Sequence, residues 1–133
     1  KKSFLTAVIN SFQLSVFTGL IISVLYLIFF KSIINLITDL DYLRFLSYGY
    51  LIWIVIIPPL ASFCYQFDGI YIGASQTVEM RNGMIISVLI FIFTSIKLVE
   101  NFGNNGLWFS LLIFMMIRSF TLNLYFPRIL KRF

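Results

Sequence analysis

Four long apolar segments, separated by short polar connections, leave this chain few ways to fold. The segments cover about residues 14–30, 45–74, 84–99 and 106–126. A helix needs roughly 20 mainly apolar residues to cross the hydrocarbon core of a bilayer, and lipid offers no partner to an unpaired backbone group. The pattern therefore predicts an all-α integral membrane protein, an antiparallel bundle of four transmembrane helices.

The composition agrees with a lipid solvent and argues against several function classes. Hydrophobic residues make up 60% of the 133 and charged residues 11%, whereas soluble domains have about half and a quarter. The net charge of +5 comes from cations near segment ends and in connections, not from a basic stripe, so we expect no nucleic-acid partner. With one cysteine, no histidine and no nucleophile–base set, we expect no metal, no cofactor and no enzyme.

The segments form one membrane domain, residues 1–133, in which we expect helices over about 3–37, 42–75, 83–100 and 105–127. The second helix is too long for an upright span, so part of it should tilt or lie in the membrane interface. Because the chain begins with Lys1 and not with methionine, we expect it to be a fragment of a longer protein.

Two local features of the second segment predict its shape. Pro58 and Pro59 remove two backbone donors in its middle, which predicts a kink. Gly69 and Gly73 have the spacing of small residues that permits another helix to approach closely.

The positive residues predict the orientation of the chain in the membrane. Loops rich in lysine and arginine face the cytoplasm. One side collects Lys1, Lys2, Arg81, Arg128, Lys131 and Arg132. The other side collects Lys31, Arg44 and Lys97. We therefore expect a multi-pass protein of the inner (plasma) membrane with both termini in the cytoplasm.

Asp68 is the most informative polar residue, because apolar sequence surrounds it. A charge in the hydrocarbon costs roughly 2.5–3.5 kcal/mol on insertion scales, so it normally faces a bundle interior or a wet cavity. Helical spacing puts Tyr65 on the same face, while Gln66 is close along the chain. One interpretation is a cation- or proton-responsive carboxylate in a substrate pathway with Tyr65 and Gln66. The other is an interfacial residue that caps or hydrogen-bonds a neighbouring helix.

Two further polar groups have competing interpretations. Arg118, well inside the fourth segment, is expected to be structural, pairing with a carboxylate or a carbonyl or extending toward the surface. Glu79, Arg81 and Asn82 lie in the expected connection between the second and third segments. They form either a solvated turn or a cytoplasmic gate that pairs with another loop.

Three short motifs follow one another in the second half of the chain. They are Phe67-Asp68-Gly69-Ile70-Tyr71-Ile72-Gly73-Ala74 with Glu79-Met80-Arg81-Asn82, then Gly103-Asn104-Asn105-Gly106-Leu107-Trp108, then Arg118-Ser119-Phe120-Thr121-Leu122. In order and spacing these motifs resemble the DinF-like branch of the multidrug and toxic compound extrusion (MATE) family, with Ser119 in place of the family's usual glycine.

This resemblance implies a fold and a function. Such transporters are similar in having twelve helices in two lobes, and this chain looks like the last four, in the C-terminal lobe. The family exports drugs and other cationic or amphipathic organic compounds in exchange for H⁺ or Na⁺. The implied partners are the lipid bilayer, the remaining helices of the transporter and a small organic substrate. Asp68 matches an acidic position of the tenth helix that some branches use in cation coupling.

Two other functions stay open at this point. One is a lipid-linked oligosaccharide flippase of the same superfamily, which would usually show more cationic residues at cavity depth than Arg118 alone. The other is a membrane scaffold or accessory subunit that does not transport.

Overall fold

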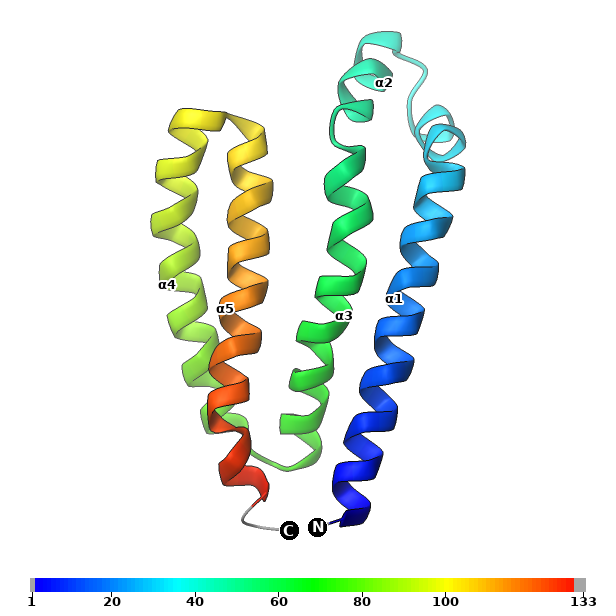
Figure 1. The fold of residues 1–133 in the computed structure, drawn as a ribbon. Helices are drawn as coiled ribbons and strands as arrows, with labels where there is room; N and C mark the ends of the chain where they lie inside the picture. The colour runs from blue at the N-terminus through cyan, green and yellow to red at the C-terminus, as the bar shows by residue number, and fades with distance from the viewer. Residues whose placement is uncertain (1, 131–133) are drawn as a thin grey trace.

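A computed structural model describes residues 2–130, and this part of the chain forms five helices and no strand. The helices are α1 (Lys2–Ile37), α2 (Asp41–Tyr48), α3 (Leu51–Gly73), α4 (Thr77–Phe102) and α5 (Asn104–Leu130). All but α2 are long and apolar enough to cross a membrane. Figure 1 shows two antiparallel pairs, α1 with α3 and α4 with α5, which meet through α3 and α5. The predicted bundle of four apolar helices is confirmed.

The second predicted helix, residues 42–75, is divided in the structure. α2 ends at Tyr48 and α3 begins at Leu51. Between them, the N–H of Gly49 donates to the carbonyl of Leu46 at 3.2 Å and closes the end of α2. Glycine is a poor residue for a helix interior, because its backbone loses the most freedom on folding. The segment is therefore a short helix followed by a 23-residue helix that needs no extreme tilt.

The polar connection before α4 is shorter than expected. We predicted the third helix from residue 83, but α4 begins at Thr77, so Glu79, Arg81 and Asn82 lie in its first two turns. An acidic side chain such as Glu79 stabilises the first turn of a helix by interacting with the helix dipole. Only residues 74–76 connect the two helices, and Ser75 takes a positive φ of 56° there.

The connection between α4 and α5 is reduced to Gly103. Its φ of 57° is a conformation that glycine adopts without steric cost, and its N–H donates to the carbonyl of Val99 at 2.9 Å. At the far end of α5, Pro127 does not close the helix, which continues to Leu130. One lost backbone bond is outweighed here by packing, because Ile129 in that last turn is only 1% exposed.

α1 packs closely on the part of α3 that carries both prolines. A Cβ on Gly19 of α1 would lie 3.0 Å from the carbonyl oxygen of Pro58, so only glycine fits without a shift. α3 runs through the two prolines without interruption, although Pro59 has no N–H for the carbonyl of Val55. The hydroxyl of Ser23 donates to that carbonyl at 2.6 Å, so α1 supplies the missing donor. The kink expected at this point stays a prediction.

The glycine positions that permit close helix approach differ from those expected. No atom lies within 4 Å of a Cβ built on Gly69 or Gly73, so these residues do not mediate packing within the described chain. A Cβ on Gly106 would instead overlap the carbonyl of Leu98, where α5 leaves the turn against α4. Spacing along one helix shows where small residues stand but not which face meets a neighbour.

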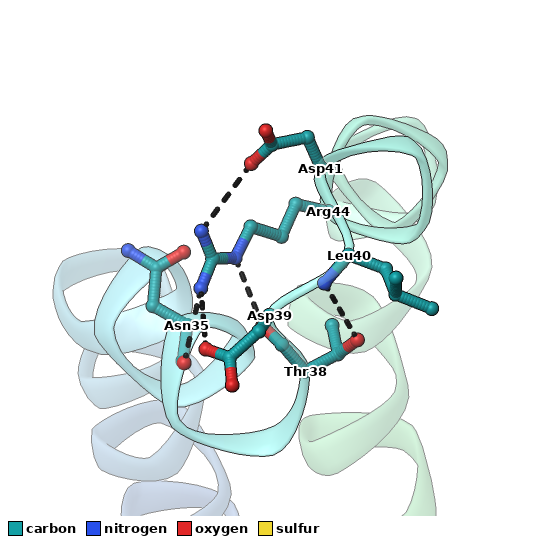
Figure 2. Close-up of polar contacts among 6 residues, drawn as sticks. All are labelled: Asn35, Thr38, Asp39, Leu40, Asp41 and Arg44. Carbon is teal, nitrogen blue, oxygen red and sulfur yellow. Dashed lines mark hydrogen bonds and ion pairs between the residues drawn. The ribbon is translucent and has the colours of Figure 1, made fainter.

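Arg44 closes the connection between α1 and α2 (Figure 2). Its Nε donates to the carbonyl of Thr38 at 2.9 Å and Nη2 donates to the carbonyl of Asn35 at 3.4 Å. The guanidinium also lies 3.3 Å from Asp39 and 3.4 Å from Asp41. The last carbonyls of a helix have no partner within the helix, so this side chain serves as the C-terminal cap of α1.

Candidate functional site

The candidate site is a buried ion pair between α3 and α5. Nη2 of Arg118 lies 2.8 Å from Oδ2 and 2.9 Å from Oδ1 of Asp68, and Nε lies 3.1 Å from Oδ1. The two side chains are only 9% and 13% exposed, respectively. A bidentate Arg–carboxylate pair is among the strongest polar contacts in proteins, and burial reduces its screening by solvent. Of the roles expected for Arg118, the structure selects pairing with a carboxylate.

Neighbouring groups complete the environment of this pair. Nη1 of Arg118 contacts the sulfur of Met84 on α4, so three helices surround the guanidinium. One turn further along α3 and α5, the hydroxyl of Tyr71 donates to the carbonyl of Leu122 at 2.5 Å. Both of these residues are fully buried. The ion pair therefore lies beside the best-packed part of the bundle, not in an open space.

Tyr65 and Gln66 lie away from the ion pair. The amide of Gln66 donates to the hydroxyl of Ser11 on α1, whereas Asp68 contacts α5. Tyr65 is 63% exposed and lines the same α1–α3 groove as Gln66. The structure thus does not bring Tyr65 together with Asp68. The helical spacing was compatible with a shared face, but α5 takes up the carboxylate and leaves the tyrosine ring at the edge.

The groove between α1 and α3 has a volume of about 460 Å³ and a mainly apolar surface, although several uncharged polar residues line it. Its polar lining residues are Ser11, Ser15, Thr18, Ser62, Tyr65 and Gln66. Several of the hydroxyls are satisfied by backbone carbonyls, as in the 3.0 Å bond from Ser15 to Ser62. These hydroxyls therefore contribute to the contact between α1 and α3 or to the α-helical backbone.

A comparison with known proteins found a relative of this chain. Over 104 residues it is 39% identical to DNA damage-inducible protein F of Escherichia coli (strain K12). By sequence, this part of the chain is similar to a DinF protein of the MATE family. The alignment covers 78% of this chain and 22% of that relative, so the chain spans about a fifth of its length. No protein-family model matches the chain, and no solved structure does.

The MATE-like motifs fall on contacts between helices. The first and third motifs supply Asp68 and Arg118, which form the buried pair. The second motif supplies Asn105, whose Oδ1 accepts a 2.9 Å hydrogen bond from Nε1 of Trp53 at the other end of α3. The same motif supplies Gly106, where α5 lies against the backbone of α4 without room for a Cβ. Much of the MATE resemblance in this segment thus corresponds to packing between neighbouring helices.

The MATE-like motif also contains the three expected gate residues. In the structure Nη2 of Arg81 donates to the neighbouring Asn82 at 3.3 Å, and both lie on the first turns of α4. Arg81 is exposed and Glu79 is partly buried. Their role as a gate stays a prediction.

Sequence reasoning missed the contribution of Ser23 and Trp53. Serine is an ordinary small residue in a membrane helix, and its bond to Val55 becomes visible only when α1 lies beside the prolines. The ring N–H of Trp53 is taken by Asn105, a contact that depends on the position of α5. The lack of a donor at Pro59 was the one available signal that a neighbouring helix must provide one.

Proposed function

We propose that this chain is part of a MATE-type secondary-active exporter of cationic or amphipathic organic compounds. The observation that carries the proposal is the 39% identity to a DinF protein over most of the chain. The homology favours a transport role over an enzymatic one. Because the chain covers only 22% of that relative, the activity is proposed for the intact protein that contains this segment and not for the segment alone.

In this proposal the α1–α3 groove borders the substrate pathway. Polar side chains on the outside of spanning helices are unfavourable against lipid, so they normally face water, ligand or other helices. Gln66 and the hydroxyl residues can orient a substrate by hydrogen bonds, and the exposed ring of Tyr65 offers a cation–π surface to an organic cation. Asp68 is not part of this groove, because it is paired on the α5 side of α3.

The mechanism we propose is alternating access. In secondary transporters of this kind, two halves rock around a site near the membrane midplane, and entry of the coupling ion drives release of the substrate. The coupling ion is H⁺ or Na⁺. The four helices of this segment would supply one wall of the cavity, and the remaining helices of the transporter would supply the rest. We therefore expect the 133-residue chain alone not to transport.

The flippase alternative has less support. Recognition of a lipid-linked pyrophosphate calls for cationic side chains that are free to bind phosphate oxygens. Arg118, the cation that sequence analysis offered at this depth, already binds both oxygens of Asp68. A neutral pair has little attraction for a doubly charged headgroup.

Transport in vesicles tests the proposal. The intact protein, reconstituted in liposomes, should move a fluorescent organic cation when an H⁺ or Na⁺ gradient is imposed, and empty liposomes should not. Absence of transport under both gradients, with correctly folded protein, would refute the exporter. Transport of a labelled lipid-linked oligosaccharide instead would favour the flippase.

A variant pair tests the role of the groove. Tyr65→Ala should raise the KM for the organic cation, because it removes the exposed ring that the substrate would contact. Phe93→Ala is the matched control, because Phe93 is a similarly exposed aromatic residue on α4, away from the groove. Equal effects of the two substitutions would show that the groove is not on the pathway.

A further inference from the structure

Three polar contacts join α3 and α5 at an almost constant offset in sequence. Asp68 pairs with Arg118 at a separation of 50 residues, and Tyr71 bonds to Leu122 at 51. At the other end of the two helices, the bond from Trp53 to Asn105 has a separation of 52 residues. Both helices run in the same direction in Figure 1, so a constant offset means one fixed register along their length.

In a membrane, polar contacts are needed to fix the register between two helices. Apolar side chains pack about as well against lipid tails as against another helix, so apolar contact alone specifies register weakly. A buried polar or ionic pair is best established as a device that fixes register between helices. Since the α1–α3 and α4–α5 pairs meet mainly through α3 and α5, this contact sets how one pair sits on the other.

The same geometry leaves Asp68 without a free oxygen for an exchangeable ion. Oδ1 faces Nε and Nη2 of Arg118, and Oδ2 faces Nη2. Met84 closes the remaining side of the guanidinium. Arginine does not lose its proton in proteins, so the carboxylate already has a permanent counter-cation.

We propose that Asp68 and Arg118 form a fixed register clamp between α3 and α5, and that Asp68 is not a site of ion exchange. Arg118 takes the place that a coupling or transported cation would need. Both residues are thus positioning residues. This inference rests on the proposed transport function for the transport measurements below, but not for the measurements of folding and melting temperature.

Charge removal, one partner at a time and then together, tests the clamp in the intact protein. Asp68→Asn and Arg118→Gln each leave one buried charge unpaired, so each should lower the amount of folded protein and its melting temperature in detergent. The double variant D68N/R118Q leaves no buried charge without a partner, which is the main cost of each single substitution, so it should recover most of the loss. Arg118→Lys, which keeps the charge, should lie between the parent and Arg118→Gln.

Transport per folded molecule separates a clamp from an ion site. With the clamp, D68N/R118Q should transport within about twofold of the parent and show the same dependence on the H⁺ or Na⁺ gradient. If too little of the double variant folds, transport is measured with the folded molecules of Asp68→Asn instead. The same result is expected: transport within about twofold of the parent, with the same dependence on the ion gradient. Loss of ion-coupled transport in every folded protein that lacks the carboxylate would overturn the inference.

A second outcome would also overturn it. If Asp68→Asn and Arg118→Gln both had the melting temperature of the parent, the pair would not position the helices. This thermal measurement needs no transport activity. The two proposals can therefore fail separately. If the intact protein does not transport in liposomes, but each single variant melts at a lower temperature and the double variant recovers, the proposed function is refuted and the clamp is supported.

Discussion

Ser23 of α1 donates a 2.6 Å hydrogen bond to the carbonyl of Val55, the acceptor that Pro59 leaves without its helical donor. An unpaired carbonyl is costly in lipid, where no water replaces the lost bond. The contact therefore replaces the hydrogen bond lost at Pro59, in a helix that continues through two adjacent prolines. It also makes α1 a lateral support for α3 at its weakest point.

Removal of this hydroxyl should weaken the α1–α3 pair. We expect Ser23→Ala to destabilise the intact protein by about 0.6 kcal/mol and by no more than about 1.7 kcal/mol, the average and the maximum for such bonds between membrane helices. Thermal unfolding in detergent measures the effect. Ser95→Ala is the matched control, because Ser95 donates only within its own helix, to the carbonyl of Ile92. A control effect as large as that of Ser23→Ala would contradict the assignment.

Gly106 should be the least tolerant glycine of the segment. An added methyl group would overlap the backbone carbonyl of Leu98, so Gly106→Ala forces α4 and α5 apart. Overpacking of this kind costs about 1–3 kcal/mol. Gly73→Ala meets no neighbouring atom and should leave the amount of folded protein unchanged. Comparison of monodisperse protein by size-exclusion chromatography checks both; equal yields would show that the helices adjust without cost.

Arg44 should stabilise the end of α1 through carbonyls rather than through carboxylates. Arg44→Ala removes the donors to Asn35 and Thr38, so amide hydrogen exchange should rise in residues 34–38. The two carboxylates are fully solvated, and exposed ion pairs contribute little. In the D39N/D41N variant, the amide hydrogens of residues 34–38 should therefore exchange at the same rate as in the parent. Faster exchange in that double variant would assign the cap to the ion pairs instead.

The bond between Trp53 and Asn105 should couple the ends of α3 and α5 that lie opposite the termini. Trp53→Phe keeps an aromatic ring beside Phe109 but removes the N–H donor. A double-mutant cycle with Asn105→Ala should give a coupling of about 0.5–1.5 kcal/mol, the net value of a typical protein hydrogen bond. If the loss of stability in the double variant equals the sum of the losses in the two single variants, the contact has no energetic role.

The orientation of the helices can be tested with single cysteines. Cys64 is 1% exposed and is replaced by alanine in the background variant. The positive-inside rule predicts that a cysteine at Arg81 reacts with a membrane-impermeant thiol reagent only from the cytoplasmic side. A cysteine at Phe45, an exposed residue of α2 on the opposite side of the bundle, should react only from outside. The reverse pattern would refute the proposed topology.

The apolar segments predicted the spanning helices well, because segment length and hydropathy are local properties. The same reasoning missed the break at Gly49, since apolar residues lie on both sides of it. It also placed Glu79 and Arg81 in a loop, although polar residues are equally compatible with the first turns of a helix that extends past the hydrocarbon.

The site was less predictable than the fold. Asp68 and Arg118 each stood out as isolated charges, but their pairing depends on how two helices 50 residues apart are arranged in space. Tyr65 was placed beside Asp68 because a helical wheel contains no neighbouring helices. Only the position of α5 shows that the carboxylate is enclosed while the ring of Tyr65 stays exposed.

The buried core of the bundle is concentrated at one end. Phe67, Tyr71, Leu122 and Ile129 form it, close to where α1 begins and α5 ends (Figure 1). Separation of the two hairpins at this end would expose the core to its surroundings. Separation at the opposite end would instead break the hydrogen bond between Trp53 and Asn105 and the ring contact between Trp53 and Phe109.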